Sequence, residues 1–208
     1  MMFPVETLTL LAFIPAALAL NFTPGADMML CIGQGLRGGP KAAVSASAGV
    51  SLGGMIHATI AGLGLGAAVA AAPWLFDAIR WIGVAYLLWL AAKALRQPLG
   101  GKVPTDVSPK RAFRDGLIVN LTNPKVIFFV LAFIPQFVDP DRDVLAQFLI
   151  FGGILAFGGL IMNGLAGVFA SGLGRRAAQS TGVAQVLGWV SASIFGFLAL
   201  RLALLERS

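Results

Sequence analysis

Charge is the scarcest property of this sequence. Of its 208 residues only 12% are Asp, Glu, Lys or Arg, whereas 58% are hydrophobic. A soluble domain carries about 25% charged residues, and a disordered chain is poor in apolar residues. The composition therefore excludes a soluble domain and intrinsic disorder, and it predicts a protein that lies in a lipid bilayer.

Cysteine and histidine are equally scarce. Cys31 is the only cysteine, so it forms no internal disulfide, and a redox carrier that works with paired cysteines would lack its second thiol. His57 is the only histidine, and one histidine with one cysteine does not make a metal site of the usual composition. We therefore predict no metal and no cofactor. His57 is expected to be either a helix-packing donor or a proton-handling group.

Long stretches without charge predict membrane-spanning helices, because about 20 apolar residues cross the hydrocarbon core. Charged residues are absent between Lys41 and Asp77, between Asp143 and Arg175, and between Arg176 and Arg201. Three further apolar runs complete an all-α polytopic membrane protein with six helices. The predicted helices are 5–33, 42–72, 75–96, 114–137, 146–172 and 182–204.

The placement of the 15 basic residues predicts the topology. With the N-terminus outside, ten of them fall on the cytoplasmic side and four on the outer side, while Lys125 lies within the membrane. Cytoplasmic loops carry the excess of Lys and Arg, so both termini are predicted outside. The net charge of +6 is also typical of nucleic-acid binding, but here the basic residues flank apolar runs, and no nucleic-acid partner is expected.

A polar linker at 98–113 divides this single transmembrane domain into two halves of three helices, 1–97 and 114–208. In the first helix, NFTPG at 21–25 resembles NLTNP at 120–124 in the fourth. An odd number of helices per half predicts a 3+3 inverted repeat, which many transporters contain. Proline removes a backbone donor, so helices 1 and 4 are predicted to be interrupted. Such breaks persist in lipid only where they are buried in protein or face a cavity.

Two charged residues lie beside the interruptions, Asp27 after the first and Lys125 after the second. A charge at the centre of a membrane helix costs about 2.5–3.5 kcal/mol on insertion scales, so it is a functional-site hypothesis by default. We interpret both as facing one central cavity, where Lys125 attracts a substrate carboxylate and Asp27 meets an amino group or carries a proton. The alternatives are that Lys125 extends to the membrane surface, and that Asp27 caps a helix or lies at the inner interface.

The residues around both interruptions resemble the LysE/RhtB family of bacterial amino-acid exporters. NLTNPK at 120–125, continuing to Pro135-Gln136-Phe137, is similar to that family's fourth-helix signature, and TPGAD at 23–27 to its first-helix motif. Ala26 stands where that motif usually has a second proline, and GVAYL at 83–87 resembles the third-helix pattern. The resemblance covers essentially the whole chain. It implies export of amino acids or derivatives across the bacterial inner membrane, driven by the proton gradient.

Two short motifs indicate other chemistry and are set aside. Residues 33–38 match the glycine pattern of nucleotide-binding loops, but they follow a predicted helix and end in a basic turn, whereas that pattern needs a preceding strand. Residues 49–53 match the pattern of a serine nucleophile, but they lie inside a predicted apolar helix rather than at a strand-to-helix turn. An enzyme is therefore not expected. Gly49 and Gly53 form a small-residue face instead, which is compatible with a homodimer and equally with packing inside one chain.

These observations predict a secondary active exporter that works by alternating access and is coupled to protons. The alternative is a passive channel, or another small-solute or redox carrier of the wider superfamily. The predicted substrate-binding residues are Asn21, Thr23, Pro24, Gly25, Asp27, Asn120, Asn123, Pro124 and Lys125. Asp27 and His57 are the candidates for proton coupling. The expected partners are the amino acid or derivative, protons and the lipid bilayer.

Overall fold

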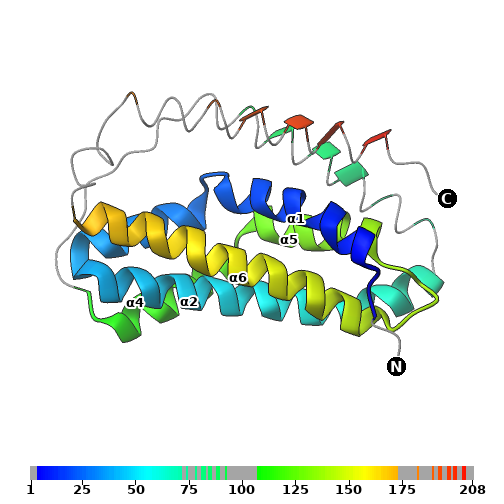
Figure 1. Cartoon of the computed structure of the whole chain (residues 1–208), viewed down its shortest axis with the longest axis horizontal. Coiled ribbons are helices and arrows are strands. Elements are labelled where there is room, and N and C mark those ends of the chain that lie inside the picture. The colour runs from blue at the N-terminus through cyan, green and yellow to red at the C-terminus, as the bar shows by residue number, and fades with distance from the viewer. Residues whose placement is uncertain are drawn as a thin grey trace.

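The computed structural model describes residues 4–71 and 107–172 without a gap, and single residues or pairs within 74–92 and 182–204 (Figure 1). Every regular element in this described part is a helix, which confirms the all-α class. The predicted third and sixth helices, 75–96 and 182–204, lie largely outside the described residues, as does 98–106 of the linker. The description below therefore concerns the first two helical spans of each predicted half.

The first predicted helix is interrupted, as expected. α1 (Thr7–Phe22) ends at Phe22, and α2 (Ala26–Ala71) begins after residues 23–25. The expected bounds at 33 and 42 are wrong, because helical structure continues to a sharp turn at Gly39, whose φ of 73° favours glycine. Proline is well suited to the start of a helix, so Pro40 begins the second segment of α2 at once. Figure 1 shows the chain folding back at this point.

The fourth predicted helix is interrupted as well, and its course differs from one regular helix over 114–137. α4 (Pro109–Leu121) begins within the predicted linker, because Ser108 caps it and Pro109 occupies its first turn. After residues 122–123 the chain continues as α5 (Pro124–Phe128), a π-helix η1 (Phe129–Phe133) and a 3₁₀-helix η2 (Ile134–Phe137). The two parts of this pair meet at a bend of 51°.

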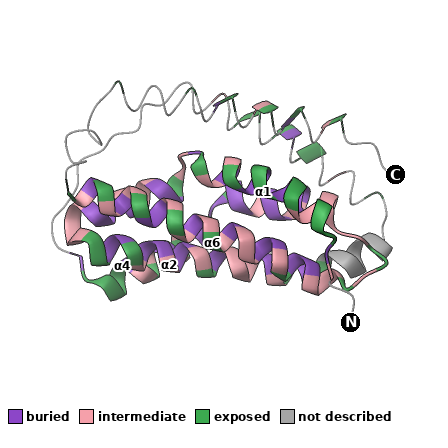
Figure 2. Cartoon of the chain, viewed as in Figure 1, coloured by how far each residue is buried: buried purple, intermediate pink, exposed green. Residues whose placement is uncertain are grey.

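α6 (Val144–Ser171) is a long uninterrupted helix, and the side chain of Asp143 caps its first turn by accepting from the Ala146 amide. The second segment of α2, 40–71, packs between α6 and α4, and the three helices turn their buried faces toward one another (Figure 2). α2 and α6 run antiparallel, since Ser47 bonds Leu160 O whereas Ser51 bonds Ala156 O.

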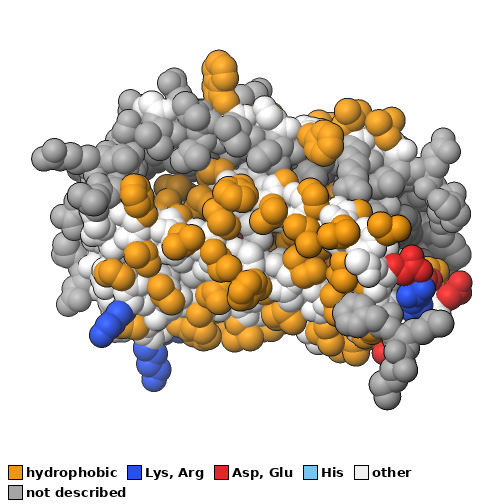
Figure 3. Space-filling model, in the orientation of Figure 1, with side chains coloured by type: hydrophobic (Ala, Val, Ile, Leu, Met, Phe, Trp, Pro, Cys, Tyr) orange, Lys and Arg blue, Asp and Glu red, His pale blue; other side chains and the backbone are white. Residues whose placement is uncertain are grey.

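The outer surface has the character of a membrane protein. Ala26–Gly64 and Val144–Ser171 are long and apolar enough to span a bilayer, and the bent pair Pro109–Leu121 with Pro124–Phe137 passes the same test as one span. Large apolar side chains such as Leu8, Phe157 and Phe169 are exposed. Figure 3 shows hydrophobic side chains over the visible face, with the charged ones gathered at its two ends.

Candidate substrate site at two broken helices

At each of the two breaks, a threonine hydroxyl donates a hydrogen bond to a backbone carbonyl of the preceding helix. Pro24 and Pro124 follow directly after the non-helical residues Thr23 and Asn123. At the first break the Thr23 hydroxyl donates to Ala19 O at 2.6 Å, and at the second the Thr122 hydroxyl donates to Ile118 O at 2.9 Å. Each threonine therefore provides a partner for a carbonyl in the last turn before the break.

Lys125 connects the second break to the first. Its Nζ donates to Thr23 O at 3.2 Å and to Leu20 O at 3.4 Å, and only 8% of the residue is exposed. These carbonyls lie at the C-terminal end of α1, where the helix dipole favours a cation. The alternative that Lys125 extends to the membrane surface is therefore wrong. Gly25 leaves room for the ammonium, since a Cβ there would lie 3.1 Å from Nζ.

The side chain of Asp27 also connects the two breaks. It lies in the first turn of α2, is 5% exposed, and its Oδ2 accepts from Asn120 Nδ2 at 2.9 Å. The side chain is therefore enclosed by protein at the start of α2. Two buried acceptors at this bond, Asp27 Oδ1 and Asn120 Oδ1, have no hydrogen-bond partner within the described structure. Native proteins rarely leave such atoms unpaired, so they indicate a place where a donor binds.

A small cavity lies between these groups. Of the predicted site residues it is lined by Asn21, Asp27, Asn120 and Lys125, and its volume of about 40 Å³ has room for two or three water molecules. The other five predicted site residues are not in its lining; they form the breaks and hold the polar groups in place. Those five are Thr23, Pro24, Gly25, Asn123 and Pro124.

Two polar residues of the cavity were not predicted as site residues. Ser51 of α2 and Asn163 of α6 both line it, and Asn163 is 6% exposed. Asn163 lies in a glycine-rich part of the sequence, between Gly158 and Gly167. A polar side chain within the charge-free stretch between Asp143 and Arg175 was the signal that marked it.

His57 lies beside the cavity rather than in its lining. Its Nε2 is 3.2 Å from the backbone oxygen of Asn120, close to the second break. This contact is the helix-packing role that was one of the two expectations, and it requires the proton on Nε2. Groups of three or more His, Cys, Asp or Glu that could hold a metal ion do not occur among the described residues.

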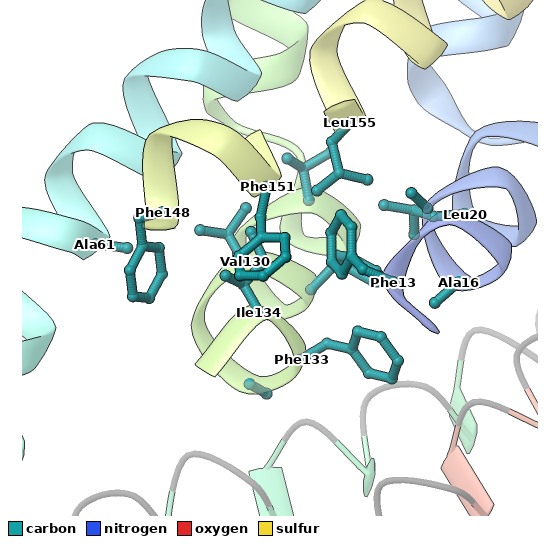
Figure 4. Close-up of a cluster of buried hydrophobic side chains, with 14 of the residues drawn as sticks. Phe13, Ala16, Leu20, Ala61, Val130, Phe133, Ile134, Phe148, Phe151 and Leu155 are labelled. Atoms are coloured by element: carbon teal, nitrogen blue, oxygen red, sulfur yellow. The ribbon is translucent and has the colours of Figure 1, made fainter. Parts of the chain in front are cut away.

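A cluster of phenylalanines packs next to one end of the cavity. Phe13 of α1 packs edge-on against Phe129 and Phe137, at ring centroid distances of 6.5 and 5.2 Å. Its ring centroid also lies 4.6 Å from that of Phe151 of α6, and Figure 4 shows these two side chains next to each other. Leu20, Val130 and Leu155 belong both to this core and to the cavity wall. The apolar cluster therefore separates the polar groups of the cavity from that end of the protein.

Ionic contacts lie at the same end, beyond the phenylalanines. Arg142, which precedes α6, bonds Glu6 at 2.7 Å and Asp139 at 3.0 Å. Gln147 of α6 fixes the backbone of Asp139 through two bonds of 2.8 Å. These contacts join the start of α1 to the loop before α6.

On the other side of Asp27, a second polar contact joins the same two helices. Gln34 of α2 is buried and donates from Nε2 to Asp115 Oδ2 of α4 at 3.3 Å. Three contacts show the relative direction of the interrupted helices: Thr23 with Lys125, Asp27 with Asn120, and Gln34 with Asp115. The residue numbers rise along α1 and α2 as they fall along α5 and α4. The interrupted helices therefore run antiparallel.

Comparison with known proteins agrees with the resemblance drawn from the motifs. The sequence model of the LysE type translocator matches residues 18–206, nearly the whole chain. The chain belongs to this family. Membership makes it a transporter rather than an enzyme, as predicted. It is, in keeping with its apolar helices, a multi-pass membrane protein.

Several relatives of this translocator are similar over most of their length. A membrane protein of Vibrio cholerae is 37% identical over 68% of this chain and 71% of its own. The homoserine/homoserine lactone efflux protein of Salmonella typhimurium is 34% identical over 68% and 70%, and the leucine efflux protein of Enterobacter sp. is 31% identical over 61% and 62%. No solved structure matches the chain.

Proposed function

We propose that this translocator exports amino acids or close derivatives across the bacterial cytoplasmic membrane by alternating access, in exchange for protons. One observation carries the proposal: Asp27 and Lys125 are buried beside one small cavity that both broken helices line. Broken helices whose ends face the substrate are the usual binding element of secondary transporters. The efflux relatives act on homoserine, its lactone and leucine by their names.

The charges of the site complement a zwitterion. Lys125 Nζ has three N–H donors and gives two to the uncharged carbonyls of Leu20 and Thr23, so one N–H and the full positive charge remain for a carboxylate. Asp27 Oδ1 and Asn120 Oδ1 accept from a substrate ammonium group. Pairing is what makes a buried charge tolerable, so a bound zwitterion stabilises both side chains.

An inverted repeat of six helices, halves 1–97 and 114–208 with the linker 98–113 between them, accounts for the packing. LGGMI at 52–56 resembles FGGLI at 157–161. A Cβ at Gly53 would lie 2.6 Å from Asn120 Oδ1, and one at Gly158 would lie 2.5 Å from Asn21 Nδ2. In each half, an equivalent glycine thus packs against the asparagine from the broken helix of the other half. A two-fold axis in the membrane plane would produce this reciprocal pair of contacts.

The size of the cavity supports alternating access. About 40 Å³ admits water but no amino acid, so the helices must separate for a substrate to enter. The phenylalanine cluster with the Arg142 contacts closes one side, and the Gln34–Asp115 contact lies toward the other. Opening each side in turn moves the substrate without a continuous pore.

Orientation and proton coupling complete the proposal. Lys110 and Arg111 at the start of α4 face the cytoplasm, and the acidic residues around Arg142 face outward, with both termini outside. Asp27 carries the coupled proton, because its free oxygen lies at the substrate site. His57 acts beside it through the Asn120 carbonyl. The small-residue face of Gly49 and Gly53 packs against α4 within the chain, so a homodimer would use another surface.

The test is exchange of radiolabelled amino acids by the purified protein in liposomes. Asp27→Asn and Lys125→Gln keep the size of each side chain, and each is expected to lower the initial rate about tenfold or more, because hydrogen bonds to charged groups contribute about 1.5–3 kcal/mol. Lys110→Gln, at an exposed position, is the matched control and keeps the rate of the wild type.

Three outcomes would contradict parts of the proposal. If both site variants kept the full rate, the site would be wrong. If efflux were independent of amino acid on the opposite side and unsaturable, the protein would be a channel. If an ionophore that collapses the pH gradient left export unchanged in energised vesicles, proton coupling would be wrong and the site would stand.

A further inference from the structure

Asn163 differs from every other polar residue that lines the cavity. Asn21 donates to Leu155 O, Ser51 donates to Ala156 O, and the Asp27, Asn120 and Lys125 side chains all have the partners described above. As a residue Asn163 is 6% exposed, it lines the cavity, and its amide bonds no residue of the described structure.

An amide that faces a cavity and bonds no described residue is free to bond a polar group that enters the cavity. The chemistry of Asn163 is therefore directed at something that enters the cavity.

The neighbourhood of Asn163 is neutral and open. One turn before Asn163 on α6, Gly159 has no side chain, so the space between Asn21 and Asn163 stays open. A Cβ at Gly159 would lie 3.3 Å from Asn21 Oδ1 and 3.7 Å from Asn163 Nδ2. No acidic or basic side chain of α6 lines the cavity. The site thus has a charged group at the two breaks and an uncharged hydrogen-bonding group on α6.

We infer that Asn163 determines substrate specificity by bonding the side chain of the substrate, and that it favours short side chains with a neutral hydroxyl or carbonyl oxygen over aliphatic ones. The inference rests on the proposed function, because Asp27 and Lys125 must hold the amino and carboxylate groups for the substrate side chain to reach α6. A site built to bond a hydroxyl rejects the analogue without it, since its own polar group is then left unpaired.

Threonine and valine provide the test, because they differ only by a hydroxyl in place of a methyl group. Liposomes with the wild type are expected to give a higher kcat/KM for threonine than for valine. Asn163→Leu should lower the threonine-to-valine ratio about tenfold or more, the effect of leaving one buried hydrogen bond unmade. Asn163→Ser, which keeps a hydroxyl, should retain a preference for threonine.

A matched control variant accompanies this test, and its outcomes distinguish a failure of the inference from a failure of the proposed function. Leu165→Ala changes an exposed residue of the same helix and should leave both rates unchanged. An equal ratio in the wild type and in Asn163→Leu, or a fall of both rates by the same factor, would overturn the inference while the proposed function stands. If the wild type exchanged no amino acid at all, the proposed function would fail, and the inference would fail with it.

Discussion

The closest backbone contact between α2 and α6 yields the sharpest test of the packing. A Cβ placed on Gly35 would overlap the carbonyl oxygen of Gly167 and would lie 2.8 Å from its carbonyl carbon and 3.2 Å from its Cα. Gly33, two residues earlier on the same helix, would meet no atom within 4 Å. The two alanine variants therefore differ in one physical respect, the presence of a neighbouring helix.

The magnitude follows from these distances. Ordinary contacts of a Cβ begin near 3.4 Å, so in Gly35→Ala the two helices must separate, and the obstacle is backbone that has no rotamer to change. Overpacking of this kind costs about 1–3 kcal/mol. Replacing glycine within a helix gains up to about 1 kcal/mol in both variants, so this gain cancels in the comparison.

The assay is the thermal unfolding midpoint of each purified variant in the same detergent. Gly35→Ala is expected to unfold roughly 2–12 °C below Gly33→Ala, using about 2–4 °C per kcal/mol for a chain of this size. It should also lower the exchange rate, because α6 carries Asn163 one turn before Gly167. Midpoints that agree within a degree would refute the close approach of α2 and α6.

Two further predictions concern the ends of the site. Arg142→Gln removes the bonds to Glu6 and Asp139, and it should lower the free energy of unfolding by less than about 1 kcal/mol, since these groups are partly exposed; the loss should vanish in 1 M salt, and an equal loss at both salt concentrations would contradict an ionic origin. Gln34→Glu places a second carboxylate against Asp115, and two charges 4 Å apart repel by about 1 kcal/mol in water and about 4 kcal/mol near a protein surface. Unfolding midpoints should therefore fall at pH 8 relative to the wild type and recover toward pH 4, where carboxylates bind protons; a deficit independent of pH would exclude repulsion as its cause.

The positions of both breaks were predictable from the sequence, because proline acts on its own backbone and needs no distant partner. Asp27 and Lys125 also stood out as charged residues in apolar surroundings, whereas Gln34 was not singled out. The start of α4 at Pro109 was missed although its signal was present: Ser108 followed by proline is a helix start, but the basic residues after it resembled a loop. Here the capping signal of Ser108 and Pro109 was outweighed by the polar, basic composition of the segment.

The partners of Lys125 and Asn163 were not predictable in the same way. Nothing near residue 125 in the sequence indicates that its ammonium reaches the carbonyls of Leu20 and Thr23, because that contact depends on how two antiparallel helices cross. In the same way, a single asparagine in an apolar helix does not indicate which cavity its side chain lines. These facts belong to tertiary structure, and only coordinates supply them.

The contact between Gly25 and Lys125 also restricts how the sequence of this translocator can diverge. Because a Cβ at position 25 would lie 3.1 Å from the ammonium, a larger residue there requires the end of the Lys125 side chain to shift by a few tenths of an ångström. The two positions lie far apart in the sequence, one at each break. A substitution at one of them therefore changes the space available to the other, so the two breaks do not vary independently.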